Sequence, residues 1–290
     1  MESVDIARPV ESAGRFAIGG DLPVHRLGFG AMQITGPGVW GPPKDRDECL
    51  RVLRRAVALG VDLFDTADAY GPFVSEDLIA EALHPYPDGL VIATKGGFTR
   101  AGPGDWREVG RPAYLRQCVE MSLRRLRLEC IDLYQLHRVD PDTPLEDSLG
   151  ELKAMQKEGK IRHIGLSEVN VDVIERARAI VDVVTVQNMY NLAERRHEAI
   201  VDYCEREQLG FIPWFPLATG RLADAGGPLA RAAQGHDRSP SQLALAWLLR
   251  RSPVMLPIPG TSSVRHLEEN CLAATVELTD LEYSELAEAS

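Results

Sequence analysis

The chain has 290 residues, with 32 Lys and Arg against 43 Asp and Glu, so its formal net charge is −11. This acidic balance argues against a general nucleic-acid-binding protein, because no excess positive charge is available to neutralise phosphates. Hydrophobic residues make up 44% and charged residues 26%, which is ordinary for a soluble globular protein. No apolar run approaches the ~20 residues of a membrane span, so we expect no membrane association.

The spacing of cysteines and histidines indicates the cellular compartment and whether a metal site is expected. The five cysteines are widely spaced without a CxxC pair, and the first residues contain no apolar signal-peptide core. This pattern is typical of reduced thiols, and we expect a cytoplasmic protein. The histidines show neither HxH nor HExxH spacing, so we expect no metal site.

The predicted elements alternate along the chain. After a tail at 1–14, residues 15–26 predict a two-stranded hairpin with a Gly-Gly-Asp turn. Apolar runs then predict eight strands, at 26–32, 61–65, 90–95, 130–137, 162–167, 181–187, 210–215 and 254–260. Apolar residues at helical spacing predict helices between these strands, among them 47–60, 112–128, 144–160, 171–180, 194–208 and 239–251.

Strands that alternate with helices indicate parallel βαβ units with right-handed crossovers. Eight such units fit a closed barrel better than an open sheet, so the predicted fold is an α/β single-domain (β/α)8 TIM barrel over 15–290. We expect the N-terminal β-hairpin to cover the barrel bottom. The long Gly-rich segments at 96–110 and 216–238 each follow a strand and should lie over the catalytic face.

Three chemically active side chains fall at predicted strand ends. Asp65, Lys95 and His137 each occupy the last position of a strand, and the residues two and four positions earlier are mainly apolar. Alternate residues of a barrel strand point inward, so all three are expected at the inner C-terminal rim. A buried charge must pair or shift its pKa, and Asp65 and Lys95 come from neighbouring strands. Tyr70 follows Asp65 by five residues, near enough for its loop to return it to the pair.

Such a cluster suits proton transfer to an alkoxide. A tyrosine has a pKa near ~10, and a neighbouring ammonium stabilises the phenolate. Two unit charges ~4 Å apart at a dielectric of ~20 interact by about 4 kcal/mol, a ceiling of roughly three pKa units. A histidine opposite would donate a hydrogen bond to a carbonyl oxygen. The arrangement favours hydride delivery to an aldehyde or ketone from a bound cofactor.

Six motifs, in order and on the matching strands, resemble those of the aldo-keto reductase family. They are FDTADAYG (64–71), ATKGG (93–97), LYQLHR (133–138), IGLSEV (164–169), VQNMYN (186–191) and IPGTSSVRHLEEN (258–270). The resemblance implies a metal-free barrel enzyme that uses NADPH, with NADH as the alternative. It also implies that Tyr70 is the general acid, that Lys95 and Asp65 tune it, and that His137 orients the substrate carbonyl.

The resemblance further implies which residues bind the cofactor. It places Gly30, Ala31 and Met32 near the nicotinamide, Ser167 and Gln187 on its carboxamide, and Trp214 on its ring. It places Pro216, Leu217, Thr219, Gly220 and Arg221 along the pyrophosphate, and Gly260, Thr261, Ser262 and His266 at the adenosine 2′-phosphate. Glu269 and Asn270 would contact the adenine. This chain has Glu168 where many members have Asn, and Gly260 and Ser262 where many have Lys or Arg.

Aromatic residues in the predicted loops indicate which substrates the pocket would accept. Trp40, Phe73 and Trp106 are expected to wall an open apolar pocket for a small-molecule carbonyl substrate. We expect NADP-dependent reduction of many aldehydes and ketones to alcohols by a monomer or weak homo-oligomer. Two alternatives remain open: a Schiff-base lyase that uses Lys95 as nucleophile, and a nucleotide-sensing barrel with poor turnover.

Overall fold

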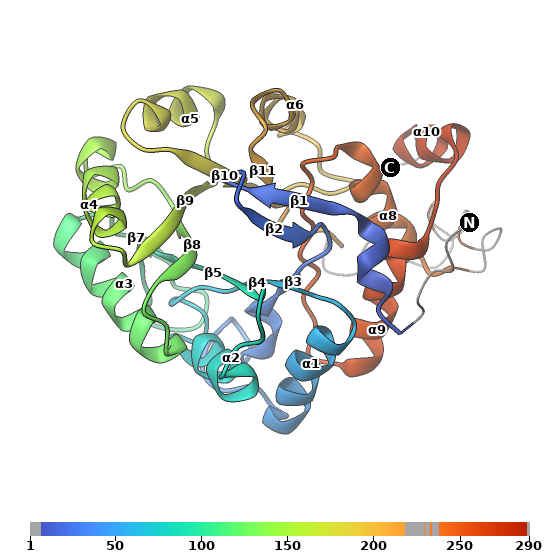
Figure 1. The fold of residues 1–290 in the computed structure, drawn as a ribbon, viewed down its shortest axis with the longest axis horizontal. Coiled ribbons are helices and arrows are strands. Elements are labelled where there is room, and N and C mark those ends of the chain that lie inside the picture. Colours follow the sequence, from blue (N-terminus) through green and yellow to red (C-terminus); the bar gives the residue numbers. More distant parts are fainter. Residues whose placement is uncertain (1–6, 218–228, 230–232, 234–237, 289–290) are drawn as a thin grey trace.

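Parallel strands form a barrel inside a ring of helices in the computed structural model, which describes residues 7–217, 229, 233 and 238–288 (Figure 1). Seven parallel strands form one sheet in the order β11-β10-β9-β8-β5-β4-β3. They are β3 (Phe29–Gly30), β4 (Leu63–Asp65), β5 (Val91–Gly96), β8 (Ile131–Leu136), β9 (Ile161–Ser167), β10 (Val183–Gln187) and β11 (Gly210–Phe211). Each lies within the run that the sequence predicts or within one residue of it.

The eighth predicted strand closes the barrel without a regular ladder. Met255 forms an isolated parallel bridge with Phe211 of β11. Two residues further on, the Pro257 carbonyl accepts a hydrogen bond of 2.9 Å from the Gly28 amide, beside β3. Pro257 and Pro259 have no amide hydrogen to donate, which explains why no continuous strand forms here. The predicted TIM-barrel fold is confirmed.

The helices cover the outside of the barrel. They are α1 (Arg46–Ala58), α2 (Val74–Leu83), α3 (Pro112–Leu126), α4 (Leu145–Lys157), α5 (Val171–Arg178), α6 (Glu198–Glu207), α8 (Pro240–Arg251), α9 (Val264–Leu272) and α10 (Asp280–Glu288). Local sequence fixes their starts: the Asp45 side chain accepts from the Glu48 amide at α1, and Ser239 and Gln242 form a capping box at α8. No helix of the described segments is long and apolar enough to span a membrane.

The N-terminal hairpin lies across one end of the barrel (Figure 1). Strands β1 (Arg15–Ile18) and β2 (Leu22–His25) are antiparallel, as expected, and Gly19 and Gly20 turn between them with positive φ. Ile18 and Val24 are fully buried and share a cluster with inward-facing strand residues such as Leu133. Residues 9–13, within the predicted tail, form a 3-10 helix, η1 (Pro9–Ala13), with Val10 buried.

The segment after β5 folds over the opposite end of the barrel. Strands β6 (Phe98–Thr99) and β7 (Arg107–Glu108) pair antiparallel, so residues 100–106 form a turn between them. Arg100 fixes this turn: its guanidinium donates to the carbonyls of Ala69 (2.7 Å) and Asp105 (2.8 Å) and lies 3.5 Å from the Trp106 ring centroid. Short 3-10 helices, η2 (Ala31–Ile34) and η4 (Ala273–Thr275), complete the described elements.

Candidate active site

Four polar side chains from separate parts of the chain meet at the C-terminal end of the barrel. Asp65 ends β4, Lys95 lies in β5, His137 follows β8, and Tyr70 returns on the loop after β4. Lys95 Nζ lies 2.5 Å from Asp65 Oδ1, 2.8 Å from the Thr66 carbonyl oxygen and 3.4 Å from the Tyr70 hydroxyl. All four side chains are buried, with Lys95 at 0% exposure.

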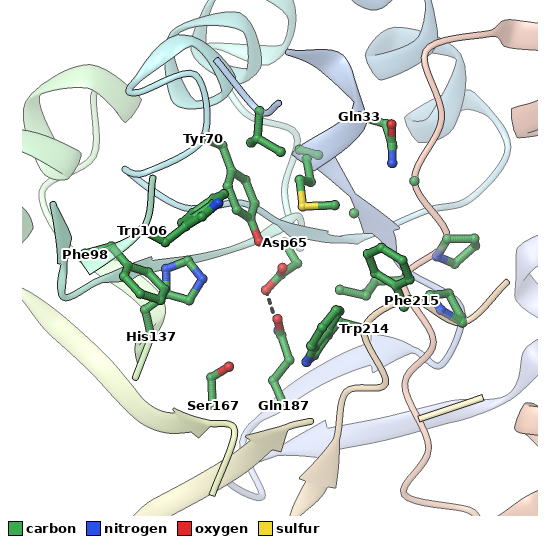
Figure 2. A pocket seen from close by; sticks show the side chains of 18 of the residues that line it. Gln33, Asp65, Tyr70, Phe98, Trp106, His137, Ser167, Gln187, Trp214 and Phe215 are labelled. Atoms are coloured by element: carbon green, nitrogen blue, oxygen red, sulfur yellow. Dashed lines mark hydrogen bonds between the residues drawn. The ribbon is translucent and has the colours of Figure 1, made fainter. Parts of the chain in front are cut away.

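The second oxygen of Asp65 is held by two amides. Gln135 Nε2 and Gln187 Nε2 each donate to Asp65 Oδ2 at 2.9 Å, and Figure 2 shows the bond from Gln187. Gln187 Nε2 also lies 3.3 Å from Gln135 Oε1. These contacts fix the carboxylate, which in turn fixes the ammonium of Lys95 beneath the phenol.

The ionisation of Tyr70 and Lys95 follows from burial and pairing. Burial raises the pKa of Tyr70, and the Lys95 ammonium opposes that rise without cancelling it. For Lys95, burial is the largest effect and lowers the pKa, but the Asp65 carboxylate and Tyr70 together outweigh it and the net pKa is raised. The lysine is therefore charged and the phenol protonated at neutral pH. This is the form that a proton donor requires.

His137 is a neutral hydrogen-bond donor. Burial, together with the positive charge of Lys95, holds the pKa of His137 well below its usual range. Its ring packs against Phe98 at a centroid distance of 4.6 Å and against Tyr70 at 5.9 Å. Nδ1 is buried without a partner among the described residues, so the single proton is better placed on Nε2.

A cavity of about 810 Å³ opens above this cluster. Phe98, Trp106 and His137 lie on one side of it, and Trp214 and Phe215 lie on the other (Figure 2). Of the residues expected at the cofactor, those that line it are Gly30, Ala31, Met32, Ser167, Gln187, Trp214, Pro216, Leu217 and Gly260. Thr261, Ser262, His266, Glu269 and Asn270 are not among its lining residues, and Thr219, Gly220 and Arg221 lie outside the described residues.

Only one of the three expected pocket aromatics reaches the cavity. Trp106 lines it, with its ring edge-on to Tyr70 at 6.4 Å. Trp40 is not among the lining residues, and the Arg100 guanidinium lies 5.7 Å from its ring centroid. Phe73 is 48% exposed and packs under Arg125. Its φ of 72° is left-handed, a backbone turn that the sequence does not reveal.

Glu168 is a site residue that the sequence reasoning did not assign. Its Oε1 accepts from Trp214 Nε1 and from the Met189 amide, both at 2.6 Å. The Met189 amide holds the carboxylate in place, and the bond from Trp214 Nε1 orients the indole at the edge of the cavity. The departure from the Asn found in many relatives was visible in the sequence, but the partner of the carboxylate was not.

The start of α9 is already occupied by a carboxylate. The amide of Val264, the first residue of this helix, donates to Glu48 Oε1 at 2.9 Å, and Arg51 pairs with Glu48 at 2.7 Å. Nearby, Arg265 Nη2 lies 2.6 Å from His266 Nε2. Backbone amides at this helix start are thus less available to a phosphate than the sequence suggests.

A buried acid, Asp68, supports the loop that carries Tyr70. Its carbonyl accepts from the Phe73 amide at 2.7 Å, and its amide donates to the Lys95 carbonyl at 3.1 Å. Burial raises the pKa of Asp68 to about 7, and the nearby charge of Glu76 adds to this effect. Because the folded protein then binds a proton that the unfolded chain has lost, the contribution of Asp68 to stability falls as pH rises from about 4 to about 7.

Asp68→Asn removes this titration. We therefore expect the unfolding free energy of the variant to rise relative to that of the wild type as pH increases. At about 1.4 kcal/mol per pKa unit, the difference in unfolding free energy should increase by about 2 to 3 kcal/mol between pH 5 and pH 8. Urea unfolding at four pH values measures it. Asp77→Asn, on the exposed face of α2, is the control and should give a constant offset over this range. A constant offset for Asp68→Asn as well would contradict the assignment.

Comparison with known proteins assigns the chain to a family. The model of the Aldo/keto reductase family matches residues 26–290. The chain is 54% identical over 269 residues to an uncharacterized oxidoreductase of Schizosaccharomyces pombe, with 93% of this chain and 88% of that one covered. It is 43% identical over 275 residues to pyridoxine 4-dehydrogenase of Escherichia coli, covering 93% and 96%.

A solved structure agrees with these relatives. An aldo-keto reductase from Klebsiella pneumoniae in complex with NADPH superposes with a TM-score of 0.80 at 26% identity, covering 94% of each chain. Taken with the barrel and its cluster of Asp, Tyr, Lys and His, these matches define an oxidoreductase of the TIM-barrel class. The chain belongs to the Aldo/keto reductase family, whose members reduce small carbonyl compounds with nicotinamide cofactors.

Proposed function

We propose that this protein reduces aldehydes and ketones to alcohols with NADPH, and that Tyr70 is the general acid. The observation that carries the proposal is the contact of the Tyr70 hydroxyl with Lys95 Nζ at 3.4 Å, in a cavity that His137 also lines. The bound cofactor supplies a hydride to the carbonyl carbon. Tyr70 gives its proton to the carbonyl oxygen, and solvent later returns one to the phenolate, so charge and protons balance.

Each residue of the cluster then has a separate task. Lys95 stabilises the phenolate as the proton leaves, and Asp65 keeps the ammonium in place at 2.5 Å. His137 donates from Nε2 to the carbonyl oxygen and sets its direction toward the phenol. Trp106 and Phe98, whose ring centroids are 5.3 Å apart, provide an apolar wall for the rest of the substrate.

The side chains at the far side of the cavity suit a nicotinamide. Ser167 Oγ accepts from Arg138, which leaves its hydroxyl proton to donate to a carboxamide oxygen. Gln187 commits Nε2 to Asp65 and keeps Oε1, without a partner among the described residues, to accept from a carboxamide nitrogen. The Trp214 ring provides the flat surface for stacking.

The orientation of Trp214 should therefore control cofactor affinity. Glu168→Ala removes the acceptor of the Trp214 indole hydrogen bond, and we expect the NADPH Kd to rise about tenfold, the effect of losing about 1.4 kcal/mol. Glu168→Gln keeps the acceptor oxygen and is the matched control, with a Kd close to that of the wild type. Quenching of tryptophan fluorescence measures both. An unchanged Kd for Glu168→Ala would show that the stacking surface does not depend on this carboxylate.

The choice between NADPH and NADH rests on the segment from Gly260 to His266. The relative from Klebsiella pneumoniae was solved with NADPH, which supports the phosphorylated cofactor here. Glu48 at the start of α9 acts against it, because a carboxylate repels a phosphate. We propose NADPH as the physiological cofactor, and parallel fluorescence titrations with NADPH and NADH test the preference.

The chemistry of Lys95 argues against a Schiff-base lyase. A nucleophilic amine must be neutral, whereas Asp65 raises the pKa of Lys95 and keeps it charged. The decisive experiment is NADPH oxidation with a panel of aldehydes, run beside borohydride trapping. Oxidation that depends on the aldehyde, without a trapped adduct, supports the reductase. A trapped adduct on Lys95 without oxidation would replace it with the lyase.

A further inference from the structure

Arg138 is a charged group at the cavity that the proposed reaction does not use. It follows His137 and lines the same cavity, but it has no role in proton transfer. Nη1 donates to the His137 carbonyl at 2.6 Å and to Ser167 Oγ at 2.9 Å. Both protons of Nη1 are thereby committed, which fixes the plane of the guanidinium.

The other edge of this guanidinium has no partner among the described residues. Within the parts of the chain that the structure describes, Nε and Nη2 of Arg138 make no hydrogen bond, and no carboxylate forms an ion pair with it. The carboxylates whose charges act most strongly on Arg138 are those of Glu168 and Glu108. Glu168 is engaged by Trp214 and Met189, and Glu108 is exposed at the rim of the cavity.

A partly buried cation without a directly paired carboxylate is costly, and a ligand that brings an anion into contact with it would reduce this cost. The free edge presents Nε–H and Nη2–H in the parallel arrangement that binds a carboxylate through two hydrogen bonds. Phe98 supports the guanidinium from below, with its ring centroid 5.7 Å from Cζ, and also packs on the His137 ring. Arg138 and the His137 ring that would orient the carbonyl therefore share Phe98 as a neighbour and line the same cavity.

We propose that Arg138 is a substrate-binding residue that selects carbonyl compounds with a carboxylate a few bonds from the reacting carbonyl, such as keto acids and semialdehydes. This inference rests on the proposed reductase function and deepens it. His137 and Tyr70 hold the carbonyl oxygen, while Nε–H and Nη2–H of Arg138 donate to the carboxylate. A neutral aldehyde of the same shape has only the aromatic wall to bind.

The test compares 3-formylbenzoate with its methyl ester, which lacks the negative charge and carries one additional methyl group. For the wild type we expect kcat/KM to be higher for the acid. Arg138→Gln should lower the ratio of kcat/KM for the acid to that for the ester about 10- to 100-fold, as expected for loss of hydrogen bonds to a charged group, because any effect of the lost bond to Ser167 on the cofactor is common to both substrates. Arg124→Gln, an exposed arginine on α3, removes the same charge and should alter neither.

The ester reports whether the site of the variant is intact, and NADPH titration reports on the cofactor. Equal kcat/KM for acid and ester in the wild type would overturn the inference and leave the reductase standing. An equal loss for both substrates in Arg138→Gln, with weaker NADPH binding, would assign Arg138 to the cofactor instead. If the wild type reduces neither compound, the proposed function fails. Calorimetric titration of 3-formylbenzoate into wild type and Arg138→Gln then still decides whether Arg138 binds a carboxylate.

Discussion

Tyr70→Phe should lose about two to four orders of magnitude in the rate of carbonyl reduction, the usual contribution of a general acid. The variant keeps the ring that packs edge-on against His137 and Trp106 and removes only the hydroxyl at 3.4 Å from Lys95. NADPH affinity should therefore stay within about twofold of the wild type. Single-turnover kinetics with an aldehyde measure the loss.

The control for this substitution is a partly buried phenol outside the cavity. Tyr86→Phe removes a hydroxyl that donates to the Leu126 carbonyl at 2.7 Å, away from the residues that line the cavity. Its rate should match the wild type. If Tyr70→Phe reduces aldehydes at the rate of Tyr86→Phe, the proton comes from another group and the role of Tyr70 is refuted.

Lys95→Met should lower the reduction rate near neutral pH by about three orders of magnitude. The ammonium and the phenolate interact by about 4 kcal/mol at a dielectric of ~20, and this stabilisation disappears with the charge. The substitution also leaves Asp65, 2% exposed, without its cation, which should cost about 3 to 5 kcal/mol of unfolding free energy. Steady-state kinetics and urea unfolding report the two effects.

A double substitution separates the chemical role of Lys95 from its structural one. Lys95→Met with Asp65→Asn removes both charges of the buried pair, so most of the lost stability should return. Activity should not return, because the phenol still lacks its ammonium. Recovery of activity together with stability would show that Lys95 only supports the fold.

The barrel was predictable because its signals are local and repeated. Apolar runs such as 90–95 and helical spacing such as 144–160 each specify one element, and parallel pairing follows from their alternation. Counting alternate residues back from the strand ends predicts an inner-rim position for Asp65, Lys95 and His137. Pro257 and Pro259 explain why the last predicted strand has a bridge and no ladder.

Loop geometry and the choice between hydrogen-bond partners were not predictable. The pairing of β6 with β7 brings Trp106 to the cavity, whereas the left-handed backbone of Phe73 turns that side chain away. The sequence suggested Gln187 as a cofactor residue but gave no sign that its amide nitrogen would be bound to Asp65. Glu168 was noted as unusual, but only the fold reveals its contact with Trp214.

The central claim is that a hydride passes from the cofactor to a carbonyl carbon while Tyr70 protonates the oxygen. The most direct measurement uses NADPH with deuterium at both C4 positions, an unlabelled aldehyde, and mass spectrometry of the alcohol. The account predicts one deuterium on the carbinol carbon with the wild type, and formation of that product slowed about two to four orders of magnitude by Tyr70→Phe. Alcohol without deuterium, or no alcohol from the wild type, would contradict it.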